Sequence, residues 1–202
     1  QDGDLDVIIQ DDTGIDYMYL MLTMCCCGVP ETLQYNLNQG WNLISLPLKV
    51  QDYTVATLFP HSSGVAFYFD NGYHATATLD NCYGYWIKID SPMTQTITGV
   101  TLCDDICPIE KGWNIVGSTW RAVPISEVET TPSDIIVSMF FKYENGYAVA
   151  TTIEPGRGYW VKASDAGTIS MNSDFSKMGL FPPIEKEDKL QELLTLTFSD
   201  SY

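Results

Sequence analysis

The sequence predicts an all-β protein: two small antiparallel β-sandwich or barrel repeats in tandem, preceded by a β-hairpin and followed by a tail. Three observations support this prediction. Two related segments follow one another along the chain. Each contains an Asn-Gly pair between runs of aromatic and β-branched residues, and each ends in a stretch of alternating side chains. Asn-Gly between such runs is typical of a hairpin turn, and alternation is typical of a strand with one buried face.

The repeat is defined by three motifs that recur in the same order. Gly-Trp-Asn occurs at 40–42 and 112–114, Asn-Gly-Tyr at 71–73 and 145–147, and Gly-Tyr-Trp at 84–86 and 158–160. The spacing between motifs differs little between the two copies, and a loop would absorb the difference. Self-similarity of this kind indicates repeated structural units. We therefore expect a first repeat over 33–102 and a second over 103–174.

Residues 1–32 are expected to form a hairpin segment, because "LDVIIQ" and "IDYMYLMLTM" flank the turn-forming "DDTG". Hairpins are expected at 65–79 and 139–153, with type I′ turns in which both central residues have positive φ. Between the first strand of each repeat and its hairpin we expect a turn or one short helix. The tail, 175–202, is expected to hold a short helix and then a strand.

The strand that carries Gly-Tyr-Trp has two different faces. Tyr85, Ile87 and Ile89 share one face, which we expect in the core, and Trp86 and Lys88 share the other. The glycine before the tyrosine would permit a bulge or a close approach of backbones.

Charge and hydropathy exclude two classes of partner. The chain carries 26 acidic and 10 basic residues, a formal net charge of −16. Such a field repels nucleic acid and anionic lipid surfaces, so we expect no nucleic acid partner. No apolar run approaches about 20 residues, so we expect no membrane insertion. The chain begins without Met, as a mature chain would after removal of a signal peptide.

The cysteines number six, an even count that favours disulfides and an oxidising compartment. Free thiols and metal binding are the alternatives, although the spacing is not that of a zinc site. The pairing is not determined by the sequence, because six cysteines allow 15 pairings. The disulfide candidates are Cys25, Cys26, Cys27, Cys82, Cys103 and Cys107. A disulfide at the junction between the repeats, where Cys103 and Cys107 lie, would stiffen their arrangement.

No catalytic residue is predicted, and we expect no enzyme. The only histidines, His61 and His74, do not recur in the second repeat. A histidine needs a positioned partner to act as a base, and no nucleophile motif accompanies either one. With 26 acidic residues, a pair of carboxylates at glycosidase spacing carries no information.

No cofactor is expected, and calcium is the metal that the sequence favours most. Its ligands would be the clustered Asp2, Asp4, Asp6, Asp11 and Asp12, because calcium takes six to eight oxygen ligands. The EF-hand pattern is absent, and solvated turns are the simpler interpretation.

Aromatic residues are the remaining candidates for binding. Trp86 and Trp160 share a face with lysine, and Tyr73 and Tyr147 follow the hairpin turns, so these four residues form a candidate ligand platform. The competing interpretation is structural: Trp41, Trp86, Trp113 and Trp160 recur as core or interface residues would.

The string Gly-Trp-Asn-Leu-Ile-Ser-Leu-Pro-Leu at 40–48, with Gly-Tyr-Trp-Ile-Lys at 84–88, resembles a repeat of large secreted bacterial cell-surface proteins. "GWNIVG" and "GYWVKAS" in the second repeat resemble the version near the C-terminus of such proteins, including those anchored after type IX secretion. The resemblance implies an extracellular β module and no activity.

Taken together, these features predict a non-enzymatic extracellular structural or adhesive protein. Its partner would be further copies of itself, joined through terminal strands into a filament or surface layer. The alternative is a carbohydrate-binding module that stacks a glycan on Trp and Tyr side chains. A hydrolase is the least supported interpretation.

Overall fold

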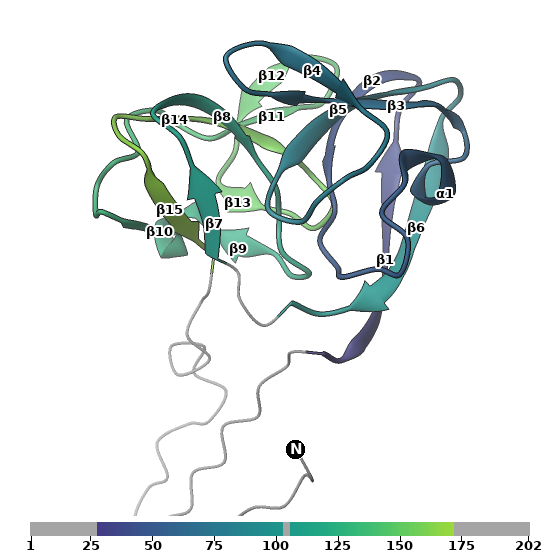
Figure 1. Ribbon diagram of the computed structural model, residues 1–202, viewed down its shortest axis with the longest axis horizontal. Coiled ribbons are helices and arrows are strands. Elements are labelled where there is room, and N and C mark those ends of the chain that lie inside the picture. Colours follow the sequence, from purple (N-terminus) through teal and green to yellow (C-terminus); the bar gives the residue numbers. More distant parts are fainter. Residues whose placement is uncertain (1–27, 103–105, 172–202) are drawn as a thin grey trace, which may run out of the picture.

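The computed structural model describes residues 28–102 and 106–171, and it confirms the all-β prediction (Figure 1). Two groups of strands lie side by side. We refer to residues 28–102 as the first half and to residues 106–171 as the second half. The predicted hairpin within 1–32 and the predicted tail strand lie outside the described residues. The predicted repeat boundaries at 33–102 and 103–174 stay predictions.

The first half contains two antiparallel sheets. Its elements are β1 (Pro30–Leu37), β2 (Gly40–Ser45), α1 (Val55–Leu58), β3 (Ser62–Phe69), β4 (Tyr73–Thr76), β5 (Gly84–Ile89) and β6 (Met93–Val100). β1 pairs with β6 along its whole length, from Pro30 opposite Val100 to Leu37 opposite Met93. The other sheet has the order β2-β5-β3-β4.

The second half pairs its strands in a similar way. Its elements are β7 (Ile106–Ile109), β8 (Gly112–Val116), β9 (Val123–Pro124), η1 (Ile125–Glu127), β10 (Glu129–Thr131), β11 (Phe141–Tyr143), β12 (Tyr147–Val149), β13 (Thr152–Ile153), β14 (Tyr159–Ala163) and β15 (Gly167–Ser170). β7 pairs with β15, and the larger sheet has the order β8-β14-β11-β12. In both halves, therefore, the Gly-Trp-Asn strand pairs with the Gly-Tyr-Trp strand, and the hairpin follows.

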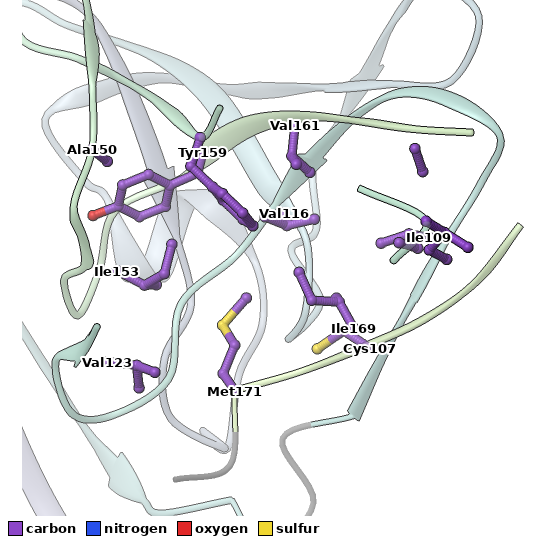
Figure 2. Packing of buried hydrophobic residues seen from close by; sticks show 13 residues of the cluster. Cys107, Ile109, Val116, Val123, Ala150, Ile153, Tyr159, Val161, Ile169 and Met171 are labelled. Carbon is purple, nitrogen blue, oxygen red and sulfur yellow. The ribbon is translucent and has the colours of Figure 1, made fainter. Parts of the chain in front are cut away.

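Each half has its own apolar core. In the second half, Tyr159 and Val161 of β14 pack with Val116, Ile153 and Ile169, all fully or almost fully buried (Figure 2). In the first half, the corresponding strand β5 contributes Tyr85, Ile87 and Ile89. The predicted core face of these strands is thus confirmed.

Both predicted hairpins form, but the predicted type I′ turns are wrong. Phe69 pairs with Tyr73, and Tyr143 pairs with Tyr147, so each loop has three residues. In each loop only the asparagine has positive φ, 51° at Asn71 and 60° at its counterpart, whereas type I′ needs two such residues. Asparagine tolerates the left-handed region, which leaves the following glycine free to be extended or right-handed.

The Gly-Trp-Asn motif forms the turn between the first two strands of each half. Gly40 has φ of 91°, a conformation that side chains rarely adopt. The Asn42 side chain accepts a hydrogen bond from the Asn38 N–H at 2.9 Å and donates to the carbonyl oxygens of Asn38 and Gly40 at 2.7 and 3.0 Å. Asn114 makes the same three contacts in the second half. The motif therefore stabilises the turn, because its asparagine side chain bonds the backbone groups there.

Candidate binding surface

The two halves meet where the Gly-Tyr-Trp strands begin. Gly84 and Gly158 approach so closely that a Cβ added at either one would lie 3.2 Å from the Cα of the other. Such a Cβ on Gly84 would also lie 2.9 Å from the Val116 carbonyl oxygen, and one on Gly158 would lie 2.8 Å from the Ile44 carbonyl oxygen. These glycines are required for close backbone packing, the second of the two roles that the sequence allowed.

Contacts between the halves come in matched pairs. A bridge joins Ile44 to Arg157, and another joins Tyr83 to Val116. The Ser45 N–H donates to the Gly156 carbonyl at 3.0 Å, and the Gly117 N–H donates to the Cys82 carbonyl at 2.7 Å. Each pair relates one half to the other at equivalent positions of the repeat, so the contact has an approximate two-fold relation.

Side chains and one covalent bond reinforce this contact. The Ser45 and Ser118 hydroxyls lie 2.8 Å apart and are buried. Cys82 and Cys107 form a disulfide that links the first half to the second. Of the six predicted disulfide candidates, these two lie within the described residues, and Cys25, Cys26, Cys27 and Cys103 lie outside them.

Trp86 and Trp160 are buried at this contact, with 8% and 9% of their surface exposed. Each one packs on the hairpin of the opposite half. The ring centroids of Trp86 and Tyr143 are 4.8 Å apart, as are those of Trp160 and Phe69. At the tryptophans this face is therefore covered by the other half, whereas Lys88 and Lys162 on the same face are exposed.

The structural interpretation of the sequence expected the other two tryptophans, Trp41 and Trp113, in a core or an interface as well. Trp41 and Trp113 are 45% and 43% exposed, so they are not core residues. Their rings lie across those of Trp86 and Trp160, with near-perpendicular planes and centroids 6.4 and 6.0 Å apart. Each exposed tryptophan occupies the second position of Gly-Trp-Asn, next to the asparagine whose side chain bonds the backbone of the turn.

Tyr73 and Tyr147 are also brought to this place, at 57% and 59% exposed. The hairpins that carry them, β3–β4 and β11–β12, lie at the same end of the molecule (Figure 1). Tyr73 contacts Trp160, and Tyr147 contacts Trp86, each pair at 6.4 Å between centroids. All four residues predicted as a ligand platform thus meet, although two of them are buried beneath it.

We call the resulting continuous surface the aromatic surface. It consists of Trp41, Phe67, Phe69, Tyr73, Trp86, Trp113, Phe141, Tyr143, Tyr147 and Trp160. Six of these were not predicted as binding residues. Their signal was present in the sequence, because Phe67 and Phe69 alternate along one strand and recur as Phe141 and Tyr143.

Two hollows open on the aromatic surface. The first, of about 480 Å³, is lined by Trp41, Phe67, Tyr73, Trp86, Tyr143 and Tyr147. The second, of about 450 Å³, is lined by Phe69, Trp113, Phe141, Tyr147 and Trp160. Both are walled by rings from both halves, so neither half alone contains a complete hollow.

The polar groups of the aromatic surface are few. The indole N–H groups of Trp86 and Trp160 are enclosed and have no hydrogen-bond partner of suitable geometry within the described part of the chain. Partial burial raises the pKa of Tyr147, and the neighbouring Tyr73 adds to this shift, while the Trp160 side chain near the hydroxyl opposes it. The Tyr147 hydroxyl is therefore neutral at neutral pH.

Other candidate residues lie apart from the aromatic surface or outside the structure. Asp2, Asp4, Asp6, Asp11 and Asp12 are outside the described residues, so the calcium site stays a prediction. Within 28–102 and 106–171, no group of three or more His, Cys, Asp or Glu side chains is placed to hold a metal ion.

His74 lies on strand β4 of the first hairpin and makes structural contacts. His74 Nε2 lies 2.9 Å from the Asp70 carbonyl oxygen, and its ring stacks on Tyr68. A larger hollow of about 620 Å³ is lined in part by Asp70, Asp80 and Glu110, and also by Phe69 and Trp113 of the aromatic surface.

No helix in the described part of the chain is long and apolar enough to cross a bilayer. No protein family, curated protein or solved structure matches the chain in sequence or structure comparisons.

Proposed function

We propose that this chain is a non-enzymatic extracellular adhesive β module, and that the aromatic surface is its contact surface. One observation carries the proposal: exposed aromatic rings from two distant parts of the sequence meet in a single patch. Aromatic side chains bury large areas and dominate recognition interfaces, whereas isolated apolar residues on a surface need no explanation.

The location outside the cell is supported by two further features. Cys82 and Cys107 form a disulfide. Disulfides persist in oxidising compartments such as the cell exterior and are rare in the cytosol. The paired Gly-Trp-Asn and Gly-Tyr-Trp motifs resemble those of secreted bacterial surface proteins. Labelling of intact source cells with a protein-specific antibody would test this location, and a signal only after permeabilisation would refute it.

The contact surface is tested by immobilised extracellular polymers and a glycan array, probed with three proteins. The parent and a Tyr68→Ala/Tyr83→Ala control should bind the same components, because these exposed tyrosines lie outside the aromatic surface. A Trp41→Ala/Trp113→Ala variant should lose at least tenfold in affinity. Equal binding by this variant, or no binding by the parent, would contradict the proposal.

Carbohydrate binding is the second candidate, and the exposure of Trp41 and Trp113 favours it. Sugar rings stack on exposed aromatic rings, so the two tryptophans would be the platforms in place of the buried Trp86 and Trp160. Loss of glycan binding in Trp41→Ala alone would support this candidate, and unchanged glycan binding would exclude it.

Self-assembly through terminal strands is the remaining part of the proposal, and its residues lie outside the described part of the chain. Strand addition supplies main-chain hydrogen bonds that can join copies head to tail. Sedimentation of the full chain against a chain lacking residues 1–24 tests it. Identical assemblies from both proteins would contradict the role of the N-terminal strand.

A further inference from the structure

We propose that the first hollow of the aromatic surface binds an organic quaternary ammonium ion of the choline type. This inference deepens the proposed function, because it names the ligand class of the same surface. It rests on the shape of the hollow, on the aromatic character of its lining, in which tyrosine hydroxyls are the accessible polar side-chain groups, and on the charge of the chain.

The walls of the first hollow are all aromatic. Trp86 stands nearly perpendicular to Trp41, with an angle of 88° between the planes, and nearly perpendicular to Tyr147, at 89°. Tyr143 is tilted by 75° to Trp86 and by 72° to Tyr147. Rings at right angles form adjacent walls of a box, so a bound group meets several rings at once. Recognition of quaternary ammonium groups by aromatic cages uses such a box, because ring faces are negative.

The polar groups disfavour a neutral polar ligand inside the hollow. A sugar hydroxyl that loses its water must find a new hydrogen-bond partner, or its desolvation opposes binding. The Trp86 indole N–H is enclosed, and the tyrosine hydroxyls are the remaining polar side-chain groups among the lining residues. A quaternary ammonium ion has no N–H or O–H on its charged group and needs no such partner.

The chain itself places an ammonium on the equivalent ring. The Lys162 Nζ lies 6.0 Å from the centroid of Trp113, a cation–π distance, although Lys162 does not itself line the second hollow. Lys162 lies opposite Trp113 on the neighbouring strand, just as Lys88 lies opposite Trp41. The net charge of −16 draws cations towards the protein and disfavours anions. We therefore expect free trimethylammonium compounds to bind more tightly than phosphocholine, which carries a phosphate.

The test is a titration of the intact protein with choline chloride, followed by tryptophan fluorescence and by calorimetry at low ionic strength. The neutral isostere 3,3-dimethylbutanol serves as the matched probe, since it has the same shape without the charge. Choline should bind at least tenfold more tightly than the isostere. Equal binding of the two would overturn the proposal, as would no binding of choline.

Variants assign the binding to one hollow. Trp41→Ala and Tyr143→Leu should each weaken choline binding about tenfold, because each removes one aromatic ring that faces the cation. Tyr68→Ala lies outside the aromatic surface and should retain the parent affinity, whereas Trp113→Ala removes a ring of the second hollow and should lose less affinity than Trp41→Ala. The urea midpoint of each variant shows that it is folded, and Trp41→Ala is informative here because its ring is about half exposed. Loss of binding in Trp113→Ala but not in Trp41→Ala would overturn the assignment.

Two further probes identify the source of the ammonium group. Phosphocholine and phosphatidylcholine vesicles are compared with free choline, and the proposal expects both to bind more weakly. Tighter binding to vesicles would replace the small-molecule assignment by a lipid surface. If Trp41→Ala/Trp113→Ala loses adhesion to extracellular polymers while choline does not bind the parent, this inference fails and the proposed function stands.

Discussion

Replacing Gly84 with alanine should separate the two halves of the protein and lower its stability. The added Cβ would overlap Ile115 Cγ2, and it would lie 2.9 Å from the Val116 carbonyl oxygen and 3.2 Å from the Gly158 Cα. Ile115 is buried and β-branched, so its methyl group has little freedom to move away. The other two neighbours are backbone atoms, and they can move only if the strands of the two halves move apart.

The expected loss follows from these contacts. Overpacking in a tightly packed interior costs about 1–3 kcal/mol, and two backbone neighbours place Gly84 at the upper end of that range. Alanine recovers about 0.4–1 kcal/mol by restricting the unfolded chain. The net loss is therefore about 2 kcal/mol, a large share of the roughly 5–15 kcal/mol that stabilises a typical domain.

Urea unfolding followed by tryptophan fluorescence measures this loss. With a denaturant slope of about 2 kcal/mol/M, the midpoint should fall by roughly 1 M. Gly146→Ala is the matched control, because nothing lies within 4 Å of its added Cβ and its φ is not positive. The Gly84→Ala/Gly158→Ala double variant should lose less than the sum of the single variants, since one separation relieves both. A Gly84→Ala midpoint equal to that of Gly146→Ala would refute the close-packing argument.

Three further predictions concern the turn, the disulfide and the core tyrosines. Asn42→Ala should cost about 1 kcal/mol in a urea titration, because it leaves partly buried backbone groups of Asn38 and Gly40 unpaired. A loss below about 0.5 kcal/mol would exclude that role. Cys82→Ser should lower the free energy of unfolding by about 3.5 kcal/mol relative to the oxidised parent, by the chain-entropy estimate for a 25-residue separation. A urea midpoint of the parent that does not change when reducing agent is added would contradict this. Burial raises the pKa of Tyr85 and of Tyr159 to about 12, whereas tyrosines of the unfolded chain ionise near 10. The unfolded chain then releases its protons first, so this contribution to stability is complete below pH 10 and is lost between pH 10 and 12. Tyr85→Phe should flatten that decline in pH-dependent urea titrations, and an unchanged slope would argue against burial as its cause.

Local features of the fold were predictable because neighbouring residues determine them. The hairpins follow from Asn-Gly between β-forming runs, and the core face of β5 follows from alternation. The turn type was not predictable from the Asn-Gly pair. In the structure only Asn71 has positive φ, and the loop has three residues, whereas a type I′ turn has two central residues, both with positive φ.

The candidate site was only partly predictable, because distant residues assemble it. Alternation correctly assigns Trp86 to the face opposite Tyr85, but it carries no information on Tyr143, which covers that face from the second half. The same limit applies to the disulfide, since the distance between Cys82 and Cys107 depends on how the halves meet. The exposure of Trp41 likewise depends on which strands lie beside it.

The mutual covering of Trp86 and Trp160 makes the two halves interdependent. A fragment containing one half would expose its tryptophan to water and would gain by pairing with a second copy of itself. The present chain carries that pairing within one polypeptide, so it forms at any protein concentration. An altered hairpin in one half would change the hollow above the other half's tryptophan, and the two sequences are therefore constrained to diverge together.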